Sequence, residues 1–242
     1  MKNEKKVIIE LKNVYKHYRM GKNIVRAVDG VSLQIREGDF VAILGPSGSG
    51  KSTMMNLIGS LDVPTRGKIL LDNEDISTLS ESDLAQIRGK KIGFIFQSFN
   101  LINNLTAKEN VMIPMIFQGY DTNERNFRAD KLMQLVDLKE RKNHSPGELS
   151  GGQQQRVAIA RALSNSPEVI LADEPTGNLD TKTGENVMDF LQDLHKKGKT
   201  IVMVTHDVDL IRTYPDIVYW LRDGKIEKIT KKPNGRGKKQ ND

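Results

Sequence analysis

The 242-residue sequence contains no cysteine. It therefore cannot form a disulfide framework, a thiolate metal site or a redox-active thiol pair, a composition that suits a reducing compartment. It also lacks an apolar run near the length of a membrane-spanning helix; the richest stretch, residues 111–117, is short and contains Pro114. Residues 1–6 precede only a strand-length apolar run, which is unlike a secretory signal. We therefore expect a cytoplasmic protein that reaches a membrane only through a partner.

The net charge of +6 suggests nucleic-acid binding, but the excess charge lies at the two ends of the chain. Residues 231–242 carry a net four positive charges and residues 1–6 a net two, so residues 7–230 are neutral overall. A neutral body gives DNA or RNA no electrostatic support, and we expect no nucleic-acid partner. The basic segment 231–242 is expected to be a disordered, solubilising tail; contact with anionic lipid headgroups is the alternative.

Composition and pattern predict an α/β fold. Apolar residues make up 37% and charged residues 28% of the chain, as in a globular protein. Strand-like segments occur at residues 7–14, 31–35, 40–44, 68–71, 92–96, 169–172, 201–204 and 217–221. The first three lie close together between turn residues such as Gly21, Gly30 and Gly38, which predicts an antiparallel β flap. The later strands alternate with helical patterns and predict a mainly parallel sheet flanked by helices.

Residues 98–162 interrupt this alternation with a mainly helical pattern. Thr106 and Glu109 have the spacing of a capping box, residues 124–136 are amphipathic, and Ser150 precedes another helical pattern. We expect a helical subdomain over about residues 98–162, inserted between two core strands of a single domain that spans residues 7–230. No repeat of 20 to 50 residues is present, which excludes a solenoid.

A glycine-rich segment follows the predicted strand 40–44 and precedes a helix expected over residues 52–60. It matches the phosphate-binding loop pattern, and the candidate nucleotide-binding residues are Gly45, Pro46, Ser47, Gly48, Ser49, Gly50, Lys51, Ser52 and Thr53. Glycines let backbone N–H groups surround phosphate oxygens, Lys51 adds positive charge at the β and γ phosphates, and Ser52 is a candidate Mg²⁺ ligand. A glycine-rich turn alone would not need the flanking strand and helix. The segment predicts a P-loop NTPase core, which leaves kinases, GTPases and ATPases open.

A second motif restricts the class. Leu149, Ser150, Gly151, Gly152 and Gln153 match the signature of ATP-binding cassette proteins, and the chain resembles this family over about residues 7–230. Ser150 can cap a helix whose glycines expose N–H groups, which gives a second anion site. In the family, this site holds the γ-phosphate of ATP bound to the opposite subunit. The resemblance therefore implies an ATPase that uses ATP and Mg²⁺ and works as a head-to-tail dimer with a second copy or a homologous cassette.

Two carboxylates end the apolar strand at residues 169–172. Ligands of parallel sheets gather at this edge, so Asp173 is a candidate Mg²⁺ ligand and Glu174 a candidate general base. Two acidic residues at the start of a surface loop are the alternative, which the position about 20 residues after the signature disfavours.

Other candidates follow from the resemblance. Gln97 matches the loop glutamine that reaches Mg²⁺ and responds to the membrane partner, and His206 matches the switch histidine that contacts the γ-phosphate. Residues 178–180 match the loop by which subunits sense one another, while Asp180 could equally be a helix N-cap. Tyr18 matches the aromatic residue that stacks on adenine, with Tyr15 as the rival.

Three segments, residues 27–33, 56–67 and 96–102, closely resemble cassettes of the macrolide-export, lipoprotein-release and antimicrobial-peptide-resistance group. The resemblance implies a separate permease as partner and a location on the cytoplasmic face of the membrane. Two other classes compete with this interpretation. A nucleic-acid-linked cassette would carry a coiled-coil insertion or a second cassette, which this chain lacks, and a P-loop kinase leaves residues 149–153 unexplained.

Overall fold

The computed structural model describes residues 5–232, in which ten strands and seven α-helices alternate along much of the chain. The strands are β1 (Val7–Met20), β2 (Asn23–Arg36), β3 (Phe40–Leu44), β4 (Arg66–Leu71), β5 (Glu74–Asp75), β6 (Ile92–Ile95), β7 (Val169–Asp173), β8 (Thr200–Thr205), β9 (Ile217–Arg222) and β10 (Lys225–Lys231). The helices are α1 (Lys51–Ile58), α2 (Glu81–Lys91), α3 (Ala107–Phe117), α4 (Thr122–Leu135), α5 (Gly151–Leu163), α6 (Thr181–Lys196) and α7 (Val208–Thr213). Short 3₁₀ helices occupy Ile76–Thr78, Lys139–Arg141 and Pro146–Glu148.

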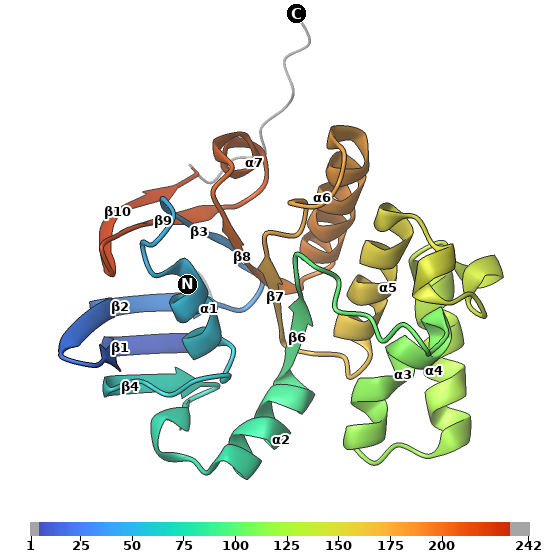
Figure 1. Cartoon of the computed structure of the whole chain (residues 1–242), viewed down its shortest axis with the longest axis horizontal. Helices are drawn as coiled ribbons and strands as arrows, with labels where there is room; N and C mark the ends of the chain where they lie inside the picture. Colours follow the sequence, from blue (N-terminus) through green and yellow to red (C-terminus); the bar gives the residue numbers. More distant parts are fainter. Residues whose placement is uncertain (1–4, 233–242) are drawn as a thin grey trace, which may run out of the picture.

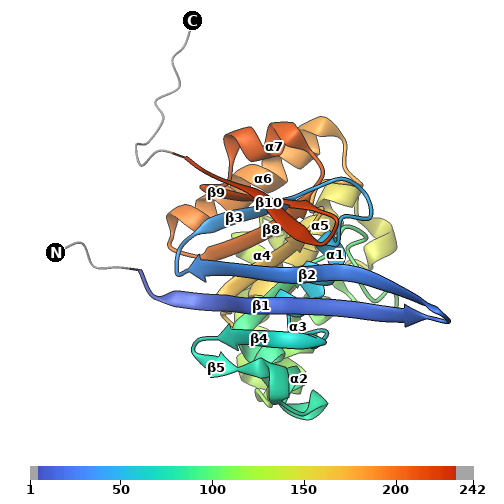
Figure 2. The ribbon, with the colours of Figure 1, turned by 90° about the vertical axis from the view of Figure 1, so that its left-hand side faces the viewer.

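An antiparallel sheet with the strand order β2-β1-β4-β5 forms the flap. Strands β1 and β2 form a long hairpin whose closing turn projects at one end (Figure 2). The turn has two residues, and Gly21 stands first with φ 62°, the geometry that suits the twist of a hairpin. Because residues directly opposite in such a pair share a face, Tyr18 lies beside Val25.

A second sheet has the order β10-β9-β3-β8-β7-β6 and is parallel except for β10. Strand β3 lies in its interior, so the prediction that residues 40–44 belong to the antiparallel flap is wrong; β4 takes that place. The reason is burial. All five residues of β3 are buried, as expected for a strand covered by helices or sheet on both faces, whereas β2 has an exposed outer end.

Helix α1 packs between the two sheets (Figure 1). Its buried residues Met54, Met55, Leu57 and Ile58 join one core with β1, β2 and one face of the parallel sheet. Helices α5 and α6 cover the opposite face. Burying each such side chain contributes about 1.5–3 kcal/mol, so the junction between β3 and α1 is held firmly from both sides.

Helices α3, α4 and α5 lie between β6 and β7 in the sequence and share a third core. Helix α3 begins with a capping box, in which the Thr106 N–H donates to Glu109 Oε2 over 2.8 Å. The helix expected at residues 124–136 is present as α4, and Asp121 caps its N-terminus. In Figure 1, α3 and α4 lie at the right, on the far side of α5 from the flap.

The carboxy-terminal boundary differs from the expected one. Strand β10 includes Lys231, and the backbone N–H of Lys232 donates to Asp216 O over 2.8 Å, so the basic segment begins inside the sheet. The rest of the predicted tail, residues 233–242, lies outside the described residues. Within residues 5–232, no helix is both long enough and apolar enough to cross a membrane.

Candidate functional site

The carboxyl ends of four parallel strands bring the sequence-distant candidates into one row. In spatial order, β3 leads into the glycine-rich loop, β8 into His206, β7 into Glu174 and β6 toward Gln97. The crevice beyond the carboxyl ends of parallel strands is where ligands of such sheets bind. Residues as far apart in the sequence as Gly45 and His206 therefore meet at one edge of the sheet.

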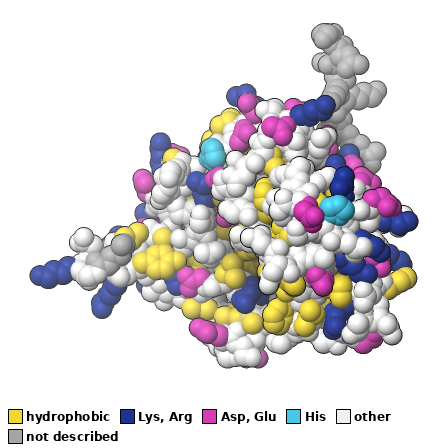
Figure 3. All heavy atoms as spheres, turned by 45° about the vertical axis from the view of Figure 1, so that its right-hand side comes forward, with side chains coloured by type: hydrophobic (Ala, Val, Ile, Leu, Met, Phe, Trp, Pro, Cys, Tyr) yellow, Lys and Arg dark blue, Asp and Glu magenta, His cyan; other side chains and the backbone are white. Residues whose placement is uncertain are grey.

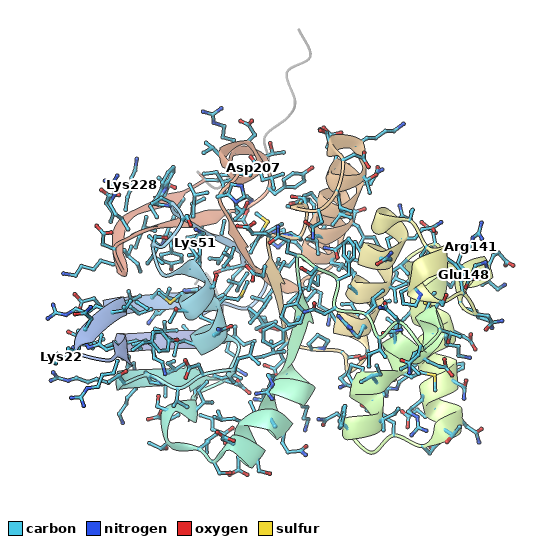
Figure 4. The ribbon with its side chains drawn as sticks, in the orientation of Figure 1. Lys22, Lys51, Arg141, Glu148, Asp207 and Lys228 are labelled. Carbon is cyan, nitrogen blue, oxygen red and sulfur yellow. The ribbon has the colours of Figure 1, made fainter. Side chains whose placement is uncertain are left out.

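A cavity of about 950 Å³ opens at this edge. Its lining residues are Ile24, Val25, Arg26, Ala27, Ser47, Gly48, Gly50, Lys51, Ser52, Thr53, Glu174, His206 and Asp223. The glycine-rich loop, Glu174 and His206 thus line one cavity, and Lys51 lies at the start of α1, left of centre in Figure 4. Of the predicted set, Tyr18, Gly45, Pro46, Ser49, Gln97, Asp173 and residues 150–153 do not line it.

The glycine-rich loop is curled tightly on itself. Lys51 Nζ donates to the carbonyl oxygens of Gly45 at 2.8 Å and Pro46 at 2.9 Å. Gly50 has φ 99°, and a Cβ there would overlap the carbonyl oxygen of Ala27. Gly48 has φ 77° with no atom within 4 Å of a built Cβ. The loop therefore needs glycine at two positions, and one of them leaves room for a ligand to approach the backbone.

The loop also fits a phosphate chemically. Ser49 is 2% exposed, and its hydroxyl has no hydrogen-bond partner among residues 5–232. The buried Lys51 ammonium has only carbonyl partners there. Helix α1 starts directly behind the loop and directs its N-terminal N–H groups toward the same space. These features are those of an anion site at a helix N-terminus.

Glu174 and His206 meet at the wall of the cavity. His206 Nδ1 lies 2.9 Å from Glu174 Oε1. The imidazole is 68% exposed and the carboxylate only 22%, so the histidine is the outer, more solvent-accessible partner. Glu174 has φ 43°, a left-handed conformation that is strained for a side-chain-bearing residue, and its N–H is held by Val204 O at 2.9 Å. This arrangement can hold a water molecule against a carboxylate that accepts its proton.

Asp173 is the last residue of β7 and is partly buried. Burial raises the pKa of its carboxyl, the nearby charge of Glu174 raises it further, and Lys51 opposes both. A bound cation would stabilise the ionised form of this carboxyl and so oppose both effects. Residues 5–232 contain no group of three or more His, Cys, Asp or Glu side chains arranged to hold a metal ion by themselves. The donor set fits Mg²⁺, which proteins hold through one or two carboxylates together with substrate phosphates and water.

Gln97 lies beside the loop that follows Glu174. The backbone carbonyl of Gln97 accepts from Asn178 Nδ2 at 3.0 Å. A Cβ on Gly177 would lie 2.6 Å from the Gln97 side-chain nitrogen, so the two loops are in close contact. Asp180 caps α6 by accepting from the N–H of Thr183 at 3.0 Å. Asp180 is therefore a helix N-cap, the alternative that the sequence left open beside a role in the loop at residues 178–180.

Sequence reasoning missed Arg161, which holds the segment after Gln97. Its guanidinium donates to Phe99 O at 2.7 Å and Asn100 O at 2.5 Å. Both residues have left-handed backbones, with φ 58° and 51°. The contacts span more than 60 residues of sequence, so no local pattern could have revealed them.

The signature residues start α5. The Ser150 hydroxyl accepts from the Gln153 N–H at 3.3 Å, and the Ser150 N–H donates to Gln153 Oε1 at 3.0 Å. Gly151 lies against Leu179, and a Cβ on Gly152 would overlap the Thr183 side chain. The signature thus packs on the loop at 178–180 and not on the glycine-rich loop of its own chain.

The two candidate tyrosines lie in different surroundings. Tyr18 donates its hydroxyl to Asp62 Oδ2 at 3.0 Å and shares the hairpin face of Val25, which lines the cavity. Tyr15 donates to Asn13 Oδ1 at 3.3 Å and lies against Gly30. The wall residues Ile24, Val25 and Arg26 were not expected from the sequence, although the two-residue turn at Gly21 would have placed Val25 opposite Tyr18.

A parallel sheet, a strand that leads into a glycine-rich loop and helix, and a carboxylate pair at the same edge define a P-loop nucleoside triphosphatase. More particularly, the chain belongs to the ABC transporter family, whose model matches residues 28–177. It is an ATP-binding ATPase subunit of that family.

Known proteins support this assignment. An uncharacterized ABC transporter ATP-binding protein of Thermotoga maritima is 52% identical over 227 residues, which cover 94% of this chain and 97% of that protein. The dimeric post-hydrolysis structure of the ATP-binding cassette MJ0796 of Methanocaldococcus jannaschii, bound to ADP and Pi, is similar with a TM-score of 0.85 and 50% identity, covering 93% and 98% of the two chains. The macrolide export ATP-binding/permease protein MacB of Chlorobaculum tepidum is 48% identical over 95% of this chain, which spans only 35% of that relative.

Proposed function

We propose that two copies of this subunit, or one copy and a homologous cassette, close head to tail around two ATP molecules, and that hydrolysis drives a separate membrane permease. The main support is the separation of the two anion sites. The glycine-rich loop lines the cavity, while Ser150 and its glycines lie outside it. Signature residues that lie away from the ATP site of their own chain are free to contact ATP bound to a partner copy. The dimeric form of the similar cassette MJ0796 supports the formation of a dimer.

Within each site, the loop N–H groups and Lys51 hold the phosphates. Ser52, Gln97 and Asp173 would hold Mg²⁺, which withdraws negative charge from phosphate oxygens when bound. Glu174 accepts a proton from the attacking water, and His206, in contact with Glu174 Oε1, orients that carboxylate and reaches the γ-phosphate. Tyr18 stacks on the adenine. The signature residues of the partner copy complete the phosphate-binding shell.

Sedimentation velocity of the Glu174→Gln variant with and without MgATP tests the dimer and the base together. We expect ATP to bind normally, turnover to be lost and the monomer to shift to a dimer, because the closed state is trapped by mass action. Lys51→Ala should abolish nucleotide binding and the shift. A Glu174→Gln variant with undiminished turnover would falsify the assignment of the base.

The permease is proposed to be of the macrolide-export type and to dock on the helical insertion. Ile116 and Phe117 at the end of α3 are more than half exposed, and Ile102 nearly half. Figure 3 shows a broken band of hydrophobic side chains across the lower half of this side of the molecule. The MacB relatives support this partner, because each is a macrolide export ATP-binding/permease protein that combines the two functions in one chain. Such docking would place the subunit on the cytoplasmic face of the membrane.

Phe117→Asp tests this surface. We expect the variant to keep the ATPase activity of the isolated subunit and to lose co-purification with a MacB-type permease expressed beside it. Ile229→Asp, at an exposed position on β10, is the control and should retain the permease. Equal retention by both variants would place the permease contact elsewhere.

A further inference from the structure

Beside the cavity, the side chains of Lys16, Tyr18 and Asp62 each contact the other two. The Tyr18 hydroxyl donates to Asp62 Oδ2 at 3.0 Å. Lys16 Nζ donates to Asp62 Oδ1 at 2.6 Å and to Val63 O at 2.8 Å. The same ammonium lies 5.2 Å from the centre of the Tyr18 ring. Asp62 therefore fixes the hydroxyl end of the ring while Lys16 covers one of its faces.

These contacts hold an otherwise accessible ring. Tyr18 is 37% exposed, whereas the side chains of Lys16 and Asp62 are only 13% and 26% exposed. Burial raises the pKa of Tyr18 and the bond to Asp62 adds to it, so the hydroxyl stays a donor. Burial alone would raise the pKa of Asp62, but hydrogen bonds from Lys16, Tyr18 and the Val63 N–H outweigh it and lower that pKa. Both groups keep the protonation states that the bond requires.

The set joins the two elements that enclose the nucleotide cavity. Asp62 lies just after α1, the helix that starts at Lys51, and Tyr18 lies on the projecting hairpin. Val25, the cross-strand neighbour of Tyr18, lines the cavity wall together with Thr53 of α1. The bond between Tyr18 and Asp62 thus fixes the hairpin relative to the helix that carries the phosphate loop. Because Lys16 lies over one face of the ring, a planar ligand would have to stack on the opposite face.

We propose that Asp62, supported by Lys16, is a positioning residue that holds the Tyr18 ring in the orientation in which it stacks on the base of the nucleotide. The proposal rests on the proposed role of Tyr18. A ring that is already held loses less freedom when the base arrives. Without the restraint, the ring must be immobilised when the base binds, which weakens binding about 2- to 10-fold. Since Asp62 acts through the base alone, phosphate binding should not depend on it.

Calorimetric titrations with ADP and with pyrophosphate, both with Mg²⁺, separate the two parts of the ligand. Tyr18→Ala should weaken ADP binding by roughly 10- to 100-fold, the usual loss of one stacking partner. Tyr18→Phe and Asp62→Asn should each weaken ADP binding about 2- to 10-fold. The double variant should be no weaker than Tyr18→Phe alone, because the two changes break the same contact. All of them should bind pyrophosphate like the unchanged protein.

Asp72→Asn is the matched control. Like Asp62, Asp72 accepts from two side chains, in its case Lys6 and Lys91, and its side chain is 23% exposed against 26% for Asp62. It lies at the other end of β1. It should bind both ligands normally. The proposal is overturned if Asp62→Asn leaves ADP binding unchanged, weakens pyrophosphate equally, or adds fully to Tyr18→Phe.

Failure of the underlying assignment gives a different result. If Tyr18→Ala binds ADP normally, Tyr18 does not stack on the base, and both its proposed role and the positioning role of Asp62 are wrong. Lys51→Ala tests the nucleotide site independently, because it should lose both ADP and pyrophosphate.

Discussion

Replacing Arg161 by Met should loosen the segment that follows Gln97. Arg161 is on α5, and its guanidinium holds the carbonyl oxygens of Phe99 and Asn100 at 2.7 and 2.5 Å. Burial lowers the pKa of this guanidinium, which reflects its partial removal from water. Methionine keeps the apolar stem and removes the donors, so the substitution isolates the two hydrogen bonds.

The expected loss can be worked from these contacts. A hydrogen bond that involves a charged group contributes about 1.5–3 kcal/mol. The lower value applies to Arg161 because the side chain is not fully buried, and two bonds give about 3 kcal/mol. Phe99 and Asn100 are held in left-handed conformations, which are unfavourable by roughly 1–2 kcal/mol for a residue with a Cβ, so they should relax once released. In a chain of this size the loss corresponds to a fall in melting temperature of about 6–12 °C.

Thermal unfolding and amide hydrogen exchange of residues 98–102 measure the effect. Arg156→Met is the matched control on the same helix, because Arg156 makes only long contacts of 3.3 and 3.4 Å with Val136 O and Asp137. It should change stability by less than about 0.5 kcal/mol. Arg161→Lys should recover part of the loss, since one ammonium cannot match the two-pronged geometry of a guanidinium. If Arg161→Met and Arg156→Met have the same melting temperature and the same amide exchange rates, the hydrogen bonds from Arg161 to Phe99 and Asn100 do not stabilise the fold.

Three further outcomes can be checked. Gly50→Ala should abolish nucleotide binding in a titration and destabilise the fold by at least about 3 kcal/mol, because the new Cβ would overlap Ala27 O in a left-handed backbone. The control is Gly119→Ala, where φ is 75° but the space is open. It should lower the stability by only about 1 kcal/mol and bind nucleotide normally. Burial raises the pKa of Asp173, so protons should compete with Mg²⁺ for its carboxylate. MgATP affinity should therefore fall more steeply with decreasing pH than the affinity for ATP without Mg²⁺; equal pH dependence of both would contradict the metal role. Burial and the carboxylate of Asp189 on α6 raise the pKa of Tyr214 to about 12, above its ordinary value of about 10. The neutral Tyr214 therefore stabilises the fold fully below pH 10, and this contribution is lost as the pH rises through 12. Denaturant unfolding from pH 10 to 12 should show a smaller decline in the free energy of unfolding for Tyr214→Phe than for the unchanged protein.

Much of the fold could be predicted because its signals are local. The strand at Phe40–Leu44, the capping boxes that begin at Thr106 and Ser150, and the helix after Asp121 each depend on residues within a few positions of one another. The glycine-rich loop is a local signal too, since Gly48 and Gly50 adopt positive φ angles and Lys51 donates to the carbonyl oxygens of Gly45 and Pro46. Contiguous motifs of this kind also sufficed to assign the family.

Sheet membership could not be predicted in the same way. A run of apolar, β-branched residues predicts a strand but does not say which strand pairs with it, and β3 was therefore expected in the wrong sheet. Its place in the parallel sheet depends on pairing with β8 and β9, more than 150 residues away. That pairing is what brings Lys51 and His206 to the same edge.

The sequence by itself determined the family and supplied the candidate site residues: the phosphate loop, the carboxylates at Asp173 and Glu174, and the signature at the start of α5. Only the tertiary structure decided how they are held, through the bond between His206 and Glu174, the grip of Arg161 on Phe99 and Asn100, and the link from Tyr18 to Asp62. The physical reason is that these contacts join residues 30 to more than 60 positions apart in the sequence, and such residues meet only when the buried cores bring the elements together.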